Sequence, residues 1–155
     1  MRRMTAIGAA MLVVAAGCGG SSDKAPRASQ QSSAPDSARV IRAWADTLRR
    51  GDIERAASFF SLPSVVANGT PPIVLRTRAD ARLFNRSLPC GAQLLRTSSS
   101  GRFTTATFRL TERPGPGSCG QGTGQTARTT FVIRGGKIHV WRRVADNPAP
   151  TGPVI

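Results

Sequence analysis

Residues 126–144 carry the strongest structural signal in the sequence, two strand-like runs separated by Gly135-Gly136. Adjacent glycines readily adopt the positive φ angles of a two-residue turn, so the pattern predicts a β-hairpin. A turn at this point pairs Ile133 with Ile138 and Phe131 with Val140, which predicts one apolar face that needs a cover. The opposite face is predicted to be mostly polar and cationic, with Arg128, Thr130, Val132, Arg134, Lys137, His139, Trp141 and Arg143.

Amphipathic helices upstream can supply that cover. Apolar residues at helical spacing predict a first helix with Asp36 or Ser37 as its N-cap. Asp52 is predicted to cap a second helix that Pro63 closes, and Thr77 to cap a third. The three helices therefore precede the hairpin in the chain.

The region between the third helix and the hairpin reads as strands and turns. Residues 92–97 and 102–110 have strand character, and residues 111–125 form a loop rich in Gly and Pro. Residues 73–75 form a short extended run between turns. Helices followed by an antiparallel meander predict an α+β domain.

The N-terminus has the three zones of an export signal. Arg2 and Arg3 precede an apolar run of residues 4–16, which is too short to span a bilayer comfortably. The sequence that follows, Ala15-Ala16-Gly17-Cys18, resembles the lipobox of bacterial lipoproteins, which implies a lipid anchor on Cys18 at the extracytoplasmic face of the cell membrane. An ordinary cleaved signal peptide remains the alternative. The predicted organisation is signal peptide 1–17, flexible tether 18–36, domain 37–145 and loose tail 146–155.

Charge and cysteines restrict the partners. The chain has 22 basic and 8 acidic residues, which indicates either a merely solvated cationic surface or one that faces polyanions such as anionic envelope polymers, whereas no motif predicts specific nucleic-acid recognition. Cys90 and Cys119 are the other thiols, and outside the cytoplasm they are expected to pair. Such a bridge would stabilise the fold by roughly 3–4 kcal/mol through loop entropy. Two distant cysteines and one histidine do not make a zinc site, and no metal or cofactor is predicted.

Two segments resemble the NTF2-like family, the fold that ketosteroid isomerases and SnoaL-like cyclases share. They are AWADTLRRGDIERAASFF at 43–60 and FVIRGGKIHVWRRV at 131–144. The resemblance implies a cone in which about three N-terminal helices pack on a curved antiparallel sheet. It also implies a pocket at the open end and, in many members, a homodimer through the outer sheet face. More narrowly, the chain is similar to exported NTF2-like lipoproteins of high-GC Gram-positive bacteria.

The acids and the single histidine have structural explanations as helix caps, first-turn residues, tether or surface, and the chain has no Tyr. General acid–base catalysis therefore lacks its parts, and no catalytic residue is predicted. We expect a non-catalytic, lipid-anchored protein that binds a small ligand or an envelope partner. The alternatives are a small-molecule isomerase, cyclase or hydrolase, and an adaptor that docks on polyanions. The candidate pocket residues, with Arg142 on the inward face, are Trp44, Phe60, Phe131, Val140 and Arg142. For Trp44 and Phe60, packing in the core is the favoured alternative.

Metabolic labelling with radioactive palmitate tests the anchor. The wild-type protein is expected to incorporate label, because the lipobox cysteine is the acceptor of the lipid. Cys18→Ser is expected to abolish it. Absence of label in the wild type, or equal label in both proteins, would contradict the prediction.

Overall fold

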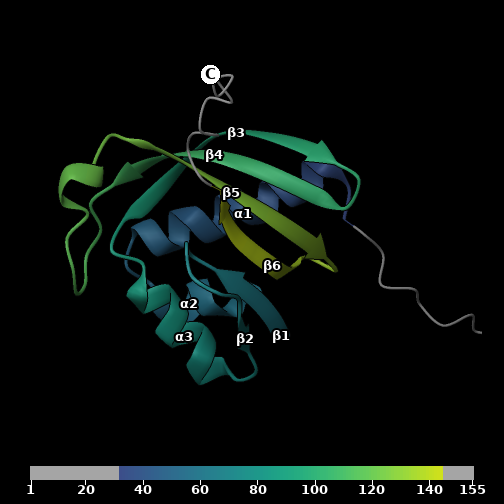
Figure 1. Cartoon of the computed structure of the whole chain (residues 1–155), viewed down its shortest axis with the longest axis horizontal. Helices are drawn as coiled ribbons and strands as arrows, with labels where there is room; N and C mark the ends of the chain where they lie inside the picture. Colours follow the sequence, from purple (N-terminus) through teal and green to yellow (C-terminus); the bar gives the residue numbers. More distant parts are fainter. Residues whose placement is uncertain (1–31, 145–155) are drawn as a thin grey trace, which may run out of the picture.

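The computed structural model describes residues 32–144, in which three helices pack on a curved six-stranded sheet (Figure 1). The predicted signal peptide, Cys18, residues 18–31 of the predicted tether and the tail lie outside these residues. The last predicted tether residues, 34–36, belong instead to the first helix. Within residues 32–144, no helix is long and apolar enough to cross a membrane. The elements are α1 Ala34–Arg49, α2 Ile53–Ser58, β1 Phe60–Ala67, β2 Ile73–Leu75, α3 Arg78–Ser87, β3 Gly91–Ser100, β4 Phe103–Thr111, a 3-10 turn Gly120–Gly122, β5 Thr126–Arg134 and β6 Lys137–Val144.

The sheet order is β2-β1-β6-β5-β4-β3. The predicted antiparallel meander is confirmed for β3 to β6, but β1 runs parallel to β6, so the sheet is mixed. The sequence pattern assigned Phe60 to the second helix and took Pro63 as its end, whereas both residues lie in β1. This strand lies between β2, which follows it closely in the chain, and β6, a long-range partner that local propensity does not report.

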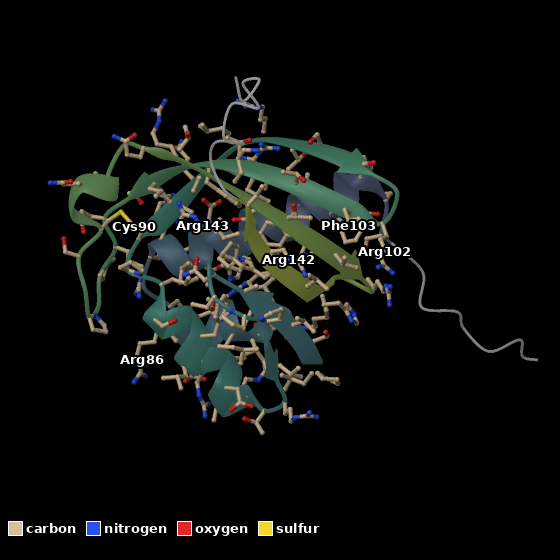
Figure 2. All side chains as sticks on the ribbon, viewed as in Figure 1. Arg86, Cys90, Arg102, Phe103, Arg142 and Arg143 are labelled. Carbon is tan, nitrogen blue, oxygen red and sulfur yellow. A yellow bond between two sulfur atoms is a disulfide. The ribbon has the colours of Figure 1, made fainter. Side chains whose placement is uncertain are left out.

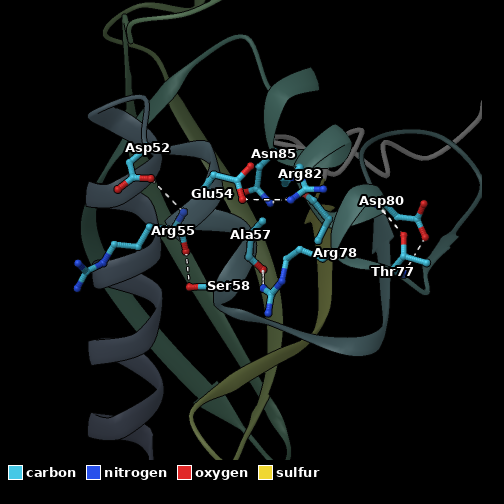
Figure 3. A network of polar contacts seen from close by, with 11 residues as sticks. Asp52, Glu54, Arg55, Ala57, Ser58, Thr77, Arg78, Asp80, Arg82 and Asn85 are labelled. Atoms are coloured by element: carbon cyan, nitrogen blue, oxygen red, sulfur yellow. Dashed lines mark hydrogen bonds and ion pairs between the residues drawn. The ribbon is translucent and has the colours of Figure 1, made fainter.

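Side-chain caps begin the helices. Ser33 Oγ accepts a hydrogen bond from the backbone N–H of Asp36, so the predicted cap at Asp36 or Ser37 was wrong by a turn. Asp52 caps α2 and Thr77 caps α3, as predicted. Arg78 of α3 donates to the carbonyl of Ala57 at the end of α2 at 3.0 Å, and Figure 3 shows how such polar contacts join the two short helices.

The hairpin forms as predicted around Gly135 and Gly136, which have φ values of 52° and 71°. Ile133 pairs with Ile138, but the next pair is Val132 with Val140. His139 is therefore an extra residue in β6, a β-bulge that shifts the remaining register by one position.

The bulge reverses the predicted facing of the rest of β6. Phe131 lies opposite Trp141 and not Val140, and Trp141 is buried in the core. Val140 and Arg142 instead take outward positions, opposite Val132 and Thr130. A one-residue slip exchanges the two faces of a strand, so the predictions for Trp141, Val140 and Arg142 were wrong together.

Trp44 is the centre of the core. Its indole ring makes edge-to-face contacts with an aromatic residue on each of four strands, at centroid distances of 5.8–6.3 Å: Phe60, Phe108, Phe131 and Trp141. Its Nε1 donates to Oδ1 of the fully buried Asn85 at 2.9 Å, and Asn85 Nδ2 donates to the carbonyl of Ala81. One side chain of α1 thereby contacts most of the sheet and α3.

The loop between β4 and β5 is organised by Glu112 and Arg113. The Glu112 carboxylate accepts hydrogen bonds from the backbone N–H of Cys119 at 3.1 Å, from Thr123 Oγ1 at 2.9 Å and from the N–H of Gly120 at 3.0 Å. These bonds favour the ionised form, so they lower the pKa of Glu112, the Cys119 bond most. Cys119 also forms the predicted disulfide with Cys90 at the start of β3.

Arg113 fixes the other side of the same loop. Its guanidinium is buried and donates to the carbonyls of Leu88 at 2.6 Å and Arg86 at 3.0 Å, at the C-terminal end of α3. The carbonyls at a helix C-terminus attract cations, which suits an arginine here. Burial lowers the pKa of Arg113.

Asn85→Ala is expected to lower the free energy of unfolding by about 1–3 kcal/mol, because the buried Trp44 N–H loses its acceptor. Urea unfolding measures the change. In a Trp44→Phe background, which has no indole N–H, the same substitution is expected to cost less. An equal cost in both backgrounds would show that the hydrogen bond is not responsible.

Glu112→Gln is expected to destabilise the protein at neutral pH and to matter less in acid. A carboxylate whose pKa is lowered by folding stabilises the fold above its ordinary pKa, about 4.3, and this stabilisation is lost as the pH falls through the lowered value. Urea unfolding of both proteins at neutral pH and at about pH 3 tests this. The control is Glu54→Gln, which removes only an exposed ion pair with Arg82. A pH-independent difference for Glu112→Gln would contradict the prediction.

Candidate functional site

A cavity of about 80 Å³ lies between α1 and the inner face of the sheet, next to the disulfide. Its exposed residues, including Asn68, Pro89 and Arg143, mark the side that opens to solvent. Most of the lining is apolar: the lining residues are Trp44, Leu48, Asn68, Leu88, Pro89, Cys90, Ala92, Phe108, Leu110, Ala127, Thr129, Trp141 and Arg143.

Strand alternation explains why these residues meet. Trp44 and Leu48 lie one turn apart on α1, and β4, β5 and β6 each contribute two residues at alternate positions. Ala127 lies opposite Phe108, and Ala92 lies opposite Leu110. The cavity exists here because alanines occupy inward positions that larger side chains would fill.

The polar groups of the cavity come from the end of β6 and its neighbours. Trp141 is 5% exposed, and its Nε1 has no hydrogen-bond partner among residues 32–144. The Nε1 of Trp44, by contrast, donates a hydrogen bond to Asn85. Arg143, labelled in Figure 2, follows two residues later on the same face of β6. Its partner on β5 is the buried Thr129. A buried donor without a partner costs about 1–3 kcal/mol, so an acceptor supplied by a ligand or by water would be favourable at this point.

The wall beside the opening is covalently fixed. Cys90 lines the cavity and is bonded to Cys119 of the loop that Glu112 and Arg113 hold in place. Leu88, whose carbonyl accepts from Arg113, also lines it. The rigid loop therefore preserves the shape of one side of the cavity.

The five predicted pocket residues do not come together. Trp44 lines the cavity, while Phe60 and Phe131 pack around Trp44 inside the aromatic core. Val140 and Arg142 lie on the outer face of the sheet. Sequence reasoning missed Trp141 and Arg143, because strict alternation from the glycine turn places both on the outer face. Only the bulge at His139 brings them inward.

The carboxylates and the histidine of residues 32–144 lie away from the cavity lining. Within the described part of the chain, neither a carboxylate nor His139 belongs to its lining. The His139 imidazole is half-buried at the bulge, and its pKa is lowered by burial and then by the charge of Arg134, so the ring is mainly neutral at pH 7.

A second hollow of about 390 Å³ lies between β1, β2 and α3 and is lined by Val66, Ile73, Val74, Leu75, Asp80, Leu83, Phe84 and Ser87. Its only carboxylate, Asp80, accepts from the backbone N–H groups of Arg76 and Thr77, and these bonds lower its pKa. Asp80 is thus an ionised helix cap and a weak base. Neither hollow contains a group with the raised carboxyl pKa of a typical general acid.

Sequence comparison finds no match, either to a family model or to a curated protein. Solved structures do resemble the chain. A candidate polyketide cyclase from Sinorhizobium meliloti has a TM-score of 0.54 and 14% identity, with 68% of this chain and 94% of that one covered. A candidate ketosteroid isomerase from Kribbella flavida has a TM-score of 0.51 and 19% identity, covering 75% and 84%.

An NTF2-like protein of unknown function from Burkholderia xenovorans has a TM-score of 0.53 and 12% identity, covering 76% of this chain and 88% of that one. Identities this low carry information about fold and not about activity. The shared arrangement is three helices against a curved mixed sheet. The chain therefore has the NTF2-like cone fold.

Proposed function

We propose that this protein is a non-catalytic binding protein, held at the extracytoplasmic face of the membrane by a lipid on Cys18. Its ligand is a small amphipathic anion. The apolar end of the ligand enters the cavity beside Trp44, and an acceptor atom meets the Trp141 N–H while the negative group lies near Arg143. The observation that carries the proposal is an apolar cavity lined by Trp141, whose buried N–H has no partner among residues 32–144, and by the exposed cation Arg143.

The size of the cavity limits the buried part of the ligand. At about 80 Å³ it is smaller than the roughly 150 Å³ engineered cavity that binds benzene, so it accepts only a few carbon atoms. A longer molecule would have to extend through the open side. A short or branched aliphatic acid meets both requirements.

The alternative, an isomerase, cyclase or hydrolase, is favoured only by the names of structural neighbours, two candidate polyketide cyclases and a candidate ketosteroid isomerase among them. Such chemistry requires a base within hydrogen-bond reach of the substrate. Within residues 32–144 the cavity lining offers an indole, a hydroxyl, an amide and a guanidinium as its polar side chains. These groups bind and orient a ligand but do not abstract a proton from carbon at neutral pH.

Binding of short aliphatic carboxylates, with the corresponding alcohols as matched probes, tests the proposal. The two tryptophans of the chain both line the cavity, so NMR observation of their indole N–H groups reports directly on it. Saturable shifts are expected, larger for Trp141 than for Trp44, whose N–H is already bonded to Asn85. Ala127→Leu, which fills the cavity, is expected to abolish the shifts.

Charge recognition is tested separately. Arg143→Gln is expected to weaken carboxylate binding about tenfold, or about 1.4 kcal/mol, and to leave alcohol binding unchanged. Arg142→Gln is the matched control, since the adjacent Arg142 points to the other face. Absence of saturable binding, or binding that survives Ala127→Leu, would contradict the proposed site.

A further inference from the structure

The outer face of the sheet carries a row of arginines that the cavity does not use. The register places Arg96 opposite Thr107, and Thr107 opposite Arg128, across β3, β4 and β5. Arg109 and Arg142 lie on the same face. On β4 the partner of Arg128 is Thr107, and Arg109 follows two residues later. On β6 the partner is Val144, and Arg142 precedes it by two residues. We call Arg96, Arg109, Arg128 and Arg142 the arginine tract, and all four are exposed.

Sheet geometry sets the spacing of the tract. Directly opposed positions on neighbouring strands are about 5 Å apart, and diagonal neighbours about 7–8 Å. Arg128 is therefore a diagonal neighbour of both Arg109 and Arg142, while Arg96 lies two strands away. Arg109, Arg128 and Arg142 follow one diagonal across β4, β5 and β6, while Arg96 on β3 lies off this diagonal, level with Thr107 and Arg128.

The tract has no opposing charge on its own strands, because β3, β4, β5 and β6 contain no Asp or Glu. The acids of residues 32–144 lie instead on or next to the helices and in the loop at Glu112. Between the arginines the outer face presents hydroxyl groups, including Thr105 and Thr130, which are hydrogen-bonded to each other at 3.1 Å. Guanidinium and hydroxyl groups together are the donors that phosphate oxygens prefer.

We propose that the arginine tract is a docking surface for a flexible linear polyanion that carries phosphodiester groups. A chain-shaped anion can follow the diagonal and neutralise several arginines at once, releasing its counterions. A bilayer fits less well, because the sheet curves around α1 and its outer face meets a plane over only a narrow strip (Figure 1). A second copy of the protein fits poorly, since symmetric contact through this face would bring two cationic tracts together.

The test uses poly(glycerol phosphate) and the full chain carrying Cys18→Ser, so that no acyl chain contributes. Arg96→Gln, Arg109→Gln and Arg142→Gln are combined, while Arg128 stays unchanged because it makes an interaction of its own. The combined variant is expected to bind at least about tenfold more weakly at low salt. The negative slope of log affinity against log salt concentration is expected to become shallower by about 2, at roughly 0.7 for each of the three lost phosphate contacts.

The matched control removes the same net charge elsewhere, by combining Arg42→Gln, Arg55→Gln and Arg86→Gln on the three helices. It is expected to change affinity less than about threefold. Each single variant, Arg109→Gln and Arg142→Gln, is expected to lower the slope by about 0.7, which keeps the test valid if the combined variant is unstable.

Three outcomes would overturn the proposal. Equal losses in the two combined variants would show a response to net charge alone. Tighter binding to phosphatidylglycerol vesicles than to the polymer would assign the face to a bilayer. If sedimentation shows a dimer, and the tract substitutions make that dimer tighter, the outer face would be assigned to contact with a second copy of the protein. None of these results depends on the proposed cavity site. The Arg143→Gln variant that tests the cavity leaves all four arginines of the tract unchanged.

Discussion

The contact of Trp44 with its surroundings is the interaction on which the structure depends. From one position on α1 the indole touches aromatic residues of β1, β4, β5 and β6, and its N–H is fixed by Asn85 of α3. The hydrogen bond sets the orientation of the ring, and the ring then defines which side chains pack as core. The cavity is the part of this inner surface where alanines of β3 and β5 leave space beside the same ring. Fold and candidate site therefore share one anchor.

The bulge at His139 gives β6 two separate roles. Because it shifts alternation by one residue, Arg143 reaches the cavity opening while Arg142 joins the arginine tract on the opposite face. Two adjacent cations of similar chemistry are thus separated by the thickness of the sheet. This arrangement allows a small anion and a polymeric anion to be bound independently. Arg143 is thereby placed beside the cavity, while Arg142 lies with Arg96, Arg109 and Arg128 on the outer face.

Much of the fold was predictable from local chemistry. The glycine turn, the helix caps at Asp52 and Thr77 and the strands of the meander follow from preferences that act over short range. The disulfide was predictable because the domain contains only two cysteines that could pair. Strand β1 was missed, because its pairing with β6 joins segments more than 70 residues apart and its sequence contains Pro63. Of the predicted pocket residues, Trp44 lines the cavity, whereas Trp141 and Arg143 were assigned to the outer face and lie on the inner one.

The sequence by itself determined where the chain turns, which segments are helical, that the hairpin exists and that charge is strongly positive, because these properties depend on neighbouring residues or on composition. Only the tertiary structure decided which side of β6 is buried. That choice rests on one extra residue accommodated between Ile138 and Val140, where packing of Trp141 against Trp44 and Phe84 favours the bulged register. The alternation of side chains along β6 does not predict the bulge, because the contacts that stabilise it come from Trp44 of α1 and Phe84 of α3. The positions of Arg142 and Arg143, and with them both proposed binding surfaces, follow from that packing.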